Sequence, residues 1–419
     1  MTLDPEQQRL FAIEAVQRLR DGGFVAYWAG GCVRDQLLGR RPKDYDVATS
    51  ATPPQISRVF RNRKTLQVGA AFGVVVVIGG RRAGQIDVAT FRHDVGYSDG
   101  RRPDEVVFSD PEQDALRRDF TINGLFFDPI EDAVIDFVGG QEDLKSRVVR
   151  AIGDPRARLA EDKLRMLRAV RFAATLGFEL ESATAAAIAE MASRITVVSA
   201  ERITQEMRAM LSHASRAQAV KTLHNLGLLA AILPEAPTSQ PVWSRTLSLL
   251  QSLSLGTFES ALAGLFWHAR RETPPLAETV ETAALRWKLS NKELDRAKWL
   301  VRHRQELANA QALPWPRLQR LLISPGIEEL LDLYQAGAGE DPQVAASVNY
   351  CRQQRALPVE KLNPPPLLTG DDLLRHGVPG GPRFKSLLEQ VRDAQLTESI
   401  TSPAEALALV DALLAEDRE

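Results

Sequence analysis

The sequence predicts an α+β protein in which a compact mixed head precedes an all-helical remainder. Up to about residue 145, short apolar runs typical of strands alternate with capped helices. From there to about residue 356 the pattern is helical, rich in Ala, Leu and Arg and poor in β-branched runs. The chain has 419 residues, of which 44% are apolar and 25% charged, which is ordinary for a globular protein of roughly two to four domains.

In the head, proline after a polar residue and Ser/Thr capping signals mark helix starts, and glycine pairs mark turns. The elements expected in order are a helix from Asp4-Pro5 to Gly22-Gly23, a strand at 24–29, a glycine turn at 30–31, a helix at 33–38, a strand at 45–48, a helix opened by a capping box from Thr52 to Gln55 and ending near Phe60, a hairpin of strands at 74–78 and 85–91, and a long polar loop at 92–104.

In the remainder, one helix is expected over 158–176, with Leu164, Leu167, Val170 and Ala174 on its apolar face. Three consecutive prolines at 364–366 predict a hinge, and two helices follow the Gly/Pro-rich segment 377–382, the last opened by a capping box from Ser402 to Glu405. The predicted domains are a catalytic head at 1–145, a helical neck at 146–270, a helical body at 271–360 and a helical tail at 361–419.

Composition excludes several classes of protein. Two cysteines rule out a disulfide scaffold or a Cys-rich zinc site. We find no signal-peptide pattern and no apolar run near the roughly 20 residues of a membrane helix, and we expect a cytoplasmic protein without a membrane partner. The oligomeric state cannot be predicted from these features.

The net charge of −2 conceals two basic stretches. Residues 145–171 hold nine Lys or Arg and three Asp or Glu, a local balance of +6, and residues 286–304 hold seven and two, a balance of +5. The second stretch also contains Trp287 and Trp299. It is typical either of a phosphate-binding patch with aromatic anchors or of an amphipathic helical hairpin with buried tryptophans.

The strongest group of polar residues begins at Gly30-Gly31 and continues through Arg34 to Asp44 and Asp46. Two glycines at a strand-to-helix turn let the backbone approach a phosphate. Two carboxylates two residues apart on one strand project from the same face and repel each other unless a cation lies between them. Taken singly, a tight turn and a solvated strand edge explain these residues; their combination and spacing favour a Mg²⁺ and nucleotide site.

Two further motifs are compatible with this chemistry. Asp87 interrupts the apolar strand that follows and is either a third catalytic carboxylate or a solvent-facing strand residue. The run from Arg117 through Arg118 and Asp119 to Asn123 offers cations for phosphates and an acceptor for a ribose hydroxyl. In isolation the same run is an ordinary charge cluster at a helix start.

The segment from Glu161 to Arg171 can select a base. Asp162 and Arg165 are three residues apart and are neighbours if the segment is one helix, where they can form an ordinary ion pair. Cytosine and adenine each present an amino donor beside a ring-nitrogen acceptor, which a carboxylate next to an arginine matches. Uracil and guanine present the reverse pattern and are excluded. The positive local charge favours this second interpretation.

These motifs, GGCVRDQLLGRRPKDYDVAT, RRDFTIN and EDKLRMLRAVRFAATLGF, resemble the class II tRNA nucleotidyltransferase and bacterial poly(A) polymerase family, as does the tail. The resemblance implies a polymerase-β-like nucleotidyltransferase head followed by a helical neck, body and tail that hold tRNA. It also implies that Asp44 and Asp46 bind two Mg²⁺ ions. For the nucleotide, it implies that Gly31 and Arg34 contact the triphosphate and that Arg118 and Asp119 contact the ribose. Asp162 and Arg165 would contact the base, Arg168 and Arg171 would lie near the phosphates, and the further nucleotide-binding residues would be Gly30, Asn123 and Glu161.

The predicted function is CCA addition, the transfer of CMP and AMP from CTP and ATP to the tRNA 3′ end without a template. Residues 92–104 match the family's flexible loop, which favours complete CCA or A-adding activity. Residues 68–74 lack the arginines typical of poly(A) polymerases, which weakens that alternative. A catalytically inactive RNA- or nucleotide-binding protein is the alternative from a different class, and the intact carboxylate and arginine motifs argue against it.

Overall fold

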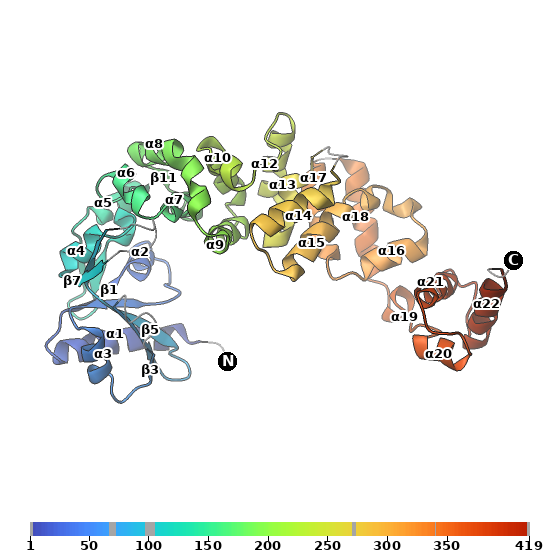
Figure 1. Cartoon of the computed structure of the whole chain (residues 1–419), viewed down its shortest axis with the longest axis horizontal. Helices are drawn as coiled ribbons and strands as arrows, with labels where there is room; N and C mark the ends of the chain where they lie inside the picture. Colours follow the sequence, from blue (N-terminus) through green and yellow to red (C-terminus); the bar gives the residue numbers. More distant parts are fainter. Residues whose placement is uncertain (1–2, 67–72, 97–104, 270–273, 340, 417–419) are drawn as a thin grey trace. The chain divides into compact units, whose positions relative to one another are not determined.

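The computed structural model describes residues 3–66, 73–96, 105–269, 274–339 and 341–416. The chain forms two compact units, one comprising Met1–Ala236 with Arg286–Lys288 and the other Pro237–Leu285 with Leu289–Glu419 (Figure 1). The predicted division into head, neck, body and tail is finer than this and stays a prediction.

The centre of the first unit is a seven-stranded mixed sheet with the strand order β3-β4-β5-β2-β1-β8-β9. The pair β2–β5 is parallel and the other neighbouring pairs are antiparallel. The strands are β1 (Ala26–Ala29), β2 (Asp46–Thr49), β3 (Thr65–Leu66), β4 (Val74–Ile78), β5 (Gln85–Thr90), β8 (Phe126–Asp128) and β9 (Ala133–Ile135).

Helices follow and flank this sheet. They are α1 (Pro5–Asp21), α2 (Gly31–Leu37), α3 (Pro53–Val59), α4 (Pro111–Leu116), the 3₁₀ turn η2 (Thr121–Asn123) and α5 (Gly140–Ser146), followed by α6 (Pro155–Glu161), α7 (Leu164–Leu176), α8 (Ser182–Met191), η3 (Ala192–Val197), α9 (Ala200–Leu211), α10 (Arg216–Asn225) and α11 (Leu228–Ile232). A two-stranded ladder of β10 (Val148–Val149) and β11 (Glu179–Leu180) interrupts this helical part.

Large aromatic side chains hold the sheet together. Phe91 and Phe126 meet edge to face, with ring centroids 5.8 Å apart. The Trp28 indole is fully buried and donates a hydrogen bond to the Ala12 carbonyl at 3.2 Å, which ties α1 to the sheet. The predicted α+β class with a mixed head is confirmed.

Helix caps and the hairpin were predicted well. The Asp4 carboxylate accepts a hydrogen bond from the Glu6 amide at 3.0 Å and caps α1, and Thr52 with Gln55 forms the expected capping box of α3. Strands β4 and β5 form the expected hairpin. Such signals lie within a few residues of the element they define, so they need no tertiary context.

Three local predictions are wrong. Residues 92–95 are not loop: β6 (Arg92–Val95) pairs with β7 (Glu105–Phe108), because the partner strand lies beyond the polar segment. Strand β2 begins at Asp46, so Asp44 precedes the strand. The predicted helix 158–176 is broken at Asp162, whose backbone is extended (φ −144°, ψ 106°). Residues 67–72 and 97–104, which include most of the segment 68–74 and of the predicted loop, lie outside the described residues.

The second unit is helical. Its elements are α12 (Val242–Ser252), α13 (Phe258–Phe266), α14 (Leu276–Arg286, whose last residue belongs to the first unit), α15 (Asn291–Arg302), η4 (Glu306–Ala312), α16 (Trp315–Leu322), α17 (Ile327–Ala338), α18 (Pro342–Arg355), α19 (Val359–Leu362), α20 (Gly370–Arg375), α21 (Arg383–Leu396) and α22 (Pro403–Glu416).

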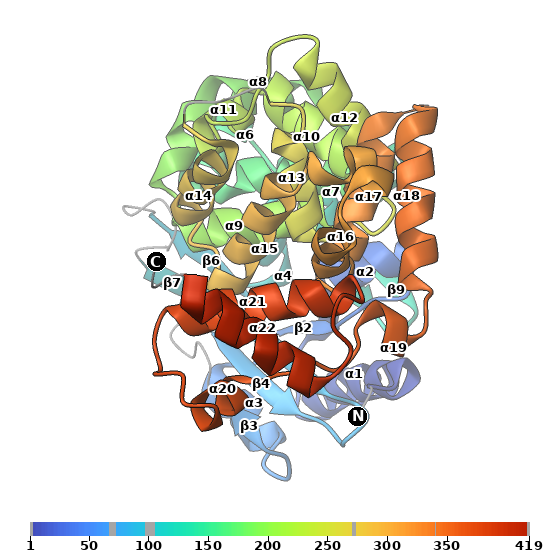
Figure 2. The same cartoon turned by 90° about the vertical axis from the view of Figure 1, so that its right-hand side faces the viewer.

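Helices α20, α21 and α22 share a hydrophobic core that includes Leu373, Leu387 and Val410, and Figure 2 shows α21 and α22 side by side. The capping box at Ser402 is present, since the Glu405 carboxylate accepts from the Ser402 amide at 3.1 Å. Of the two helices predicted here both are found, and the short α20 is an addition. Across the described ranges, no helix has the length and apolar character needed to cross a membrane.

Candidate active site

Three carboxylates gather where β2 and β5 run side by side. Asp46 is directly opposite Asp87 in the parallel register, and Asp44 lies just before β2. Asp46 is the first residue of β2, the central strand of the sheet, and the residue is exposed, but the protein around its carboxyl group removes water from that group. This desolvation, with the nearby charges of Asp44 and Asp87, raises the pKa of Asp46 to about 6 against the opposing effect of Arg118.

The same crowding affects Asp87, whose pKa is raised by partial burial and by the charge of Asp44. Carboxylates that repel one another in this way, and that offer only oxygen atoms as ligands, fit a bound Mg²⁺. No group of three or more His, Cys, Asp or Glu among the described residues forms a complete metal site. A cation held here would therefore take its other ligands from water and from a phosphate-bearing substrate.

A glycine turn lies next to the carboxylates. Helix α2 begins at Gly31, and Gly30 precedes it with φ +74°, a conformation that favours glycine. A Cβ at Gly30 would lie 2.8 Å from Nη1 of Arg118. The Cys32 thiol in the first turn lies 3.9 Å from the Asp46 carbonyl, so the turn and β2 are in contact. Burial raises the pKa of Cys32 to about 12, so this thiol is a packed side chain and is poorly suited to act as a nucleophile.

Arg34 and Asn123 connect the glycine turn to the second motif. The Arg34 guanidinium donates to Oδ1 of Asn123 at 2.7 Å and to Oδ1 of Asp35 at 2.7 Å and 2.9 Å. Asn123 lies in η2 and donates to Oδ1 of Asp119 at 3.0 Å. The predicted residues of the two motifs are therefore joined by hydrogen bonds although they lie 89 positions apart.

Asp114 is a part of this network that the sequence reasoning missed. Its side chain is almost fully buried within α4 and accepts from Arg118 at 2.9 Å and from Arg117 at 2.7 Å. Burial alone would raise the pKa of Asp114, but the two guanidinium groups outweigh it and lower the pKa. Asp114 therefore fixes both arginines, and its place three and four residues before them was the signal available in the sequence.

Asp119 is held by several donors at once. Its carboxylate accepts from Arg168 at 2.7–2.8 Å, from Asn123 and from the Phe120 amide at 2.8 Å. Burial opposes ionisation, yet Arg168 and Asn123 prevail and lower the pKa of Asp119 to about 2. Arg168, which the sequence reasoning expected near phosphates, is thus also the partner of Asp119.

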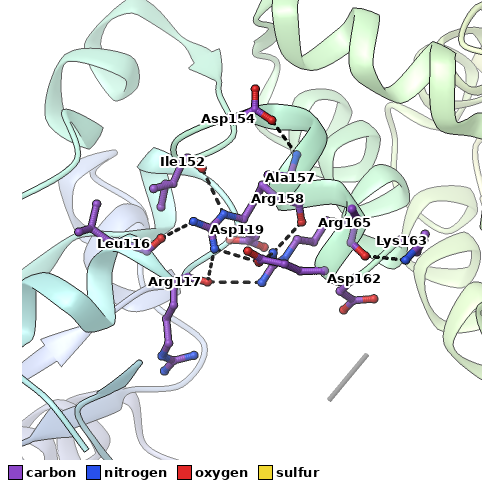
Figure 3. Close-up of polar contacts among 12 residues, drawn as sticks. Leu116, Arg117, Asp119, Ile152, Asp154, Ala157, Arg158, Asp162, Lys163 and Arg165 are labelled. Atoms are coloured by element: carbon purple, nitrogen blue, oxygen red, sulfur yellow. Dashed lines mark hydrogen bonds and ion pairs between the residues drawn. The ribbon is translucent and has the colours of Figure 1, made fainter. Parts of the chain in front are cut away.

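The side chains of Asp162 and Arg165 do not pair with each other, although the Arg165 amide donates to the Asp162 carbonyl at 3.0 Å. Because the helix breaks at Asp162, its carboxylate turns to Arg202 of α9, with Nη2–Oδ2 at 2.6 Å and Nη1–Oδ1 at 3.1 Å. Arg165 pairs instead with Glu161 and donates to the Arg158 carbonyl at 2.8 Å. Figure 3 shows Arg165 pointing toward Arg117. The expectation that the two residues lie on one continuous helix is therefore wrong, and the alternative of an ordinary ion pair between them is not found.

Two arginines that sequence reasoning missed support this region. Arg158 donates to the carbonyls of Leu116 at 2.6 Å, Arg117 at 3.2 Å and Ile152 at 3.1 Å, and so ties α6 to the end of α4 (Figure 3). Arg202 comes from a helix 40 positions beyond Asp162. No local pattern pointed to Arg202, since only the fold brings α9 against the break in the helix.

The basic stretch 145–171 is largely compensated by acids from other elements. Arg168 pairs with Asp119, and Arg171 pairs with Glu206 at 2.5 Å. Further pairs of the same kind are Arg150 with Asp143 and Arg156 with Glu190. The local balance of +6 therefore does not describe a bare cationic surface, although several guanidinium groups keep N–H groups for a ligand.

The second basic stretch, 286–304, favours the packing interpretation of its tryptophans. Trp287 is 2% exposed, and its indole donates to the Ile232 carbonyl at 2.9 Å. Trp299 is half-buried. Several of the cations are paired with acids: Arg286 with Glu235, Lys288 with Glu201, Arg296 with Glu329 and Lys298 with Glu281.

A mixed sheet with crowded carboxylates on neighbouring strands, beside a glycine turn and a group of arginines, defines a nucleotidyltransferase head. Comparison with known proteins agrees. Residues 26–150 match the model of the poly A polymerase head domain, and residues 177–238 match that of the probable RNA and SrmB-binding site of polymerase A.

Relatives extend the match to the whole chain. The CCA-adding enzyme of Geobacillus kaustophilus is 33% identical over 407 residues, covering 94% of this chain and 95% of the relative. Poly(A) polymerase I of Salmonella typhi is 36% identical over 256 residues, 56% of this chain. The chain belongs to the class II tRNA nucleotidyltransferase and poly(A) polymerase family.

Solved structures of CCA-adding enzymes also resemble this chain over nearly its whole length. The crystal structure of the Bacillus stearothermophilus CCA-adding enzyme in complex with CTP has a TM-score of 0.77 at 30% identity and covers 99% of both chains. The Thermotoga maritima CCA-adding enzyme complexed with tRNA has a TM-score of 0.68 at 19% identity and supports the fold alone. The expectation of a nucleotidyltransferase head followed by helical parts is confirmed.

Proposed function

We propose that this chain is a CCA-adding tRNA nucleotidyltransferase, which adds C, C and A to the 3′ end of tRNA from CTP and ATP without a nucleic-acid template. The observation that carries the proposal is the pairing of Asp46 with Asp87 across β2 and β5, beside the glycine turn and the arginine network. The similarity to CCA-adding enzymes over nearly the whole chain supports it.

In the proposed reaction the 3′ hydroxyl oxygen of tRNA forms a bond to the α-phosphorus of the nucleotide. The bond from that phosphorus to the bridging oxygen breaks, and pyrophosphate leaves with the electron pair. Asp87 is proposed to take the hydroxyl proton, because its raised pKa suits a general base. Asp44 and Asp46 would hold two Mg²⁺ ions, which when bound neutralise charge on the carboxylates and the phosphates.

The nucleotide is proposed to lie along the arginine network. Gly30, Gly31 and Arg34 face the triphosphate, with Arg168 and Arg171 near its charges. Arg118, Asp119 and Asn123 are proposed to contact the ribose; the lowered pKa of Asp119 keeps its carboxylate ionised and able to accept from a hydroxyl.

Base selection is proposed to involve Asp162 and Arg165, with Glu161 holding Arg165. Since each of the two side chains is fixed by its own partner, neither neutralises the other. A carboxylate and a guanidinium held separately can meet the amino donor and ring acceptor of C or A, and they oppose the reversed pattern of U and G.

Product length tests the proposal. Three transcripts of one tRNA, ending before CCA, after C and after CC, are each offered CTP and ATP and resolved to single nucleotides. A CCA-adding enzyme extends all three to the same end and stops. An A-adding enzyme extends only the transcript ending in CC, and a poly(A) polymerase, which the similarity to the Salmonella typhi protein keeps as a second candidate, adds runs of A. Substrates of this kind accord with the cytoplasmic location that the sequence predicts.

A further inference from the structure

One aromatic ring lies among three of the arginines in the candidate site. The Phe172 ring centroid is 4.1 Å from Cζ of Arg171, 5.1 Å from Cζ of Arg34 and 5.2 Å from Cζ of Arg168. Phe172 is on α7 and is only 6% exposed. Its ring is therefore a buried surface against which cations from two elements converge, Arg34 from α2 and the other two from α7.

Each of these arginines is also tethered by an acid. Arg34 is held by Asp35, Arg168 by Asp119 and Arg171 by Glu206. A guanidinium has five N–H groups, and these tethers use only some of them. For Arg171 the contact with Glu206 is made by Nε, and both terminal nitrogens have no hydrogen-bond partner among the described residues.

Three guanidinium groups this close repel one another unless something offsets their charge. The acids offset part of this repulsion, and the negative face of the aromatic ring attracts each cation further, most strongly where water is excluded. A leucine or methionine side chain occupies most of the same space without that attraction. The ring thus fixes the positions of the three guanidinium groups. A ligand that complements them is an anion with several negative charges on adjacent groups.

We propose that Phe172 is a positioning residue that holds Arg34, Arg168 and Arg171 in place for a polyphosphate, namely the triphosphate of the incoming nucleotide and the pyrophosphate that leaves. This inference rests on the proposed function, because it assigns the triphosphate to this side of the site. Phe172 acts through the three arginines and does not itself contact the ligand.

A purely structural role is the rival explanation, since Phe172 also packs edge to face against Phe120 at 5.8 Å. The test compares Phe172→Leu with Phe172→Tyr, which keeps the ring. The matched control is Phe178→Leu, a buried ring just beyond the same helix that has no stacked arginine within the described part of the chain. Phe172→Met is a second variant of similar volume if Phe172→Leu does not fold.

Two readouts are measured on the full-length variants. In transfer to a tRNA ending before CCA, Phe172→Leu should raise KM for CTP and ATP alike by about tenfold, with kcat changed much less and C/A selectivity unchanged. In calorimetric titration with pyrophosphate and Mg²⁺, it should weaken binding by a similar factor. Phe172→Tyr should stay near the wild type in both, and Phe178→Leu should change neither.

The inference is overturned if Phe172→Leu lowers thermal stability but leaves KM and pyrophosphate affinity as in the wild type, or if Phe178→Leu has the same effect. The titration needs no tRNA. If the wild type adds no nucleotide to tRNA but Phe172→Leu still binds pyrophosphate more weakly than the wild type, the proposed function is rejected and the role of Phe172 is retained.

Discussion

The carboxylate of Asp162 is paired with Arg202 of α9, through contacts of 2.6 Å and 3.1 Å, and not with Arg165 three residues further along the chain. Arg202 and the Leu164 amide, at 3.1 Å, together fix the orientation of this carboxylate. The Asp162 carboxylate, which is proposed to accept a hydrogen bond from the amino group of the base, is thus oriented by a residue of a second helix. Mutation can show which arginine interacts with it.

Double-mutant cycles on stability should separate the two possible partners. Asp162→Ala and Arg202→Ala remove the same contact, so their effects on the free energy of unfolding should be coupled by about 0.5 kcal/mol or more. Asp162→Ala and Arg165→Ala remove different contacts and should add to within about 0.3–0.5 kcal/mol. Urea unfolding of the single and double variants measures both cycles; strong coupling of Asp162 to Arg165 would contradict the observed pairing.

Base selection should depend on Arg202 as well as on Asp162 and Arg165. In Arg202→Ala the Asp162 carboxylate loses its anchor, and discrimination against UTP should fall by roughly 1–3 kcal/mol, which is about 5- to 150-fold in kcat/KM for CTP over UTP. Single-turnover incorporation of UTP and CTP gives the ratio. The neighbouring Glu201→Gln, which breaks only the exposed pair with Lys288, is the control and should keep the selectivity. An unchanged ratio in Arg202→Ala would rule out the anchoring role.

The helix break shows where sequence reasoning was sufficient and where it was not. Caps and the hairpin depend on short-range patterns, and these were predicted correctly. The sequence left the role of Asp87 open, and the structure places it opposite Asp46 on the neighbouring strand. The apolar face of 158–176 was also correct, since Leu164 and Leu167 are buried. Periodicity continued across Asp162, however, so the pattern alone gave no sign that the helix stops there.

The partners of the charged residues were the least predictable part. Arg202 and Glu206 each complete a contact that spacing within one motif did not contain. A count of charges indicated an exposed cationic stretch, whereas the structure compensates it from helices distant in sequence. Pairing energies depend on which groups the fold brings within about 4 Å, and composition holds no information on that.

Asp119 should stabilise the fold in a pH-dependent way. Its pKa is about 2 in the folded protein and near 3.8 in the unfolded chain, so its contribution is present above pH 4 and is lost as the pH falls toward 2. At neutral pH this corresponds to about 2 kcal/mol. Asp119→Asn should therefore be less stable than the wild type at pH 7, with the difference in the free energy of unfolding narrowing as the pH falls from 4 toward 2. Urea unfolding at several pH values measures it; a difference independent of pH would contradict the ionised pairing.

Asp46 should have the opposite effect. Its pKa is about 6 in the folded protein and near 3.8 when unfolded, so its ionisation above pH 4 costs stability, fully so above pH 6. In the absence of metal, Asp46→Asn should melt at a higher temperature than the wild type at pH 7–8 and at the same temperature near pH 4. In a separate assay with Mg²⁺, Asp46→Asn should have lost nucleotide transfer.

Magnesium should reverse that order. A cation that binds the folded wild type raises its melting temperature by mass action, and Asp46→Asn, with a weakened site, should gain less. Melting curves in EDTA and in MgCl₂ at pH 7.5 provide the comparison. Equal gains in both proteins, or robust transfer by Asp46→Asn, would reject Asp46 as a metal ligand.

Replacement of Gly30 should damage the site more than the fold. An alanine there must adopt φ +74° and ψ −124°, outside the left-handed helical region, which costs about 1–3 kcal/mol, and its Cβ would lie 2.8 Å from Nη1 of Arg118. Because that nitrogen belongs to a flexible side chain, Arg118 can move aside, which displaces it from Asn123 and from the carboxylates. Gly30→Ala should therefore lose transfer activity by more than tenfold while its melting temperature falls by only a few degrees.

Gly23→Ala separates the two effects. Gly23 also has a positive φ, of +84°, but a Cβ there meets no atom within 4 Å among the described residues. It should show the backbone cost as a similar fall in melting temperature with transfer retained, because no site residue has to move. Equal losses of activity in the two variants would mean that backbone strain alone disables the enzyme, whereas loss confined to Gly30→Ala would tie it to the position of Arg118 over the glycine turn.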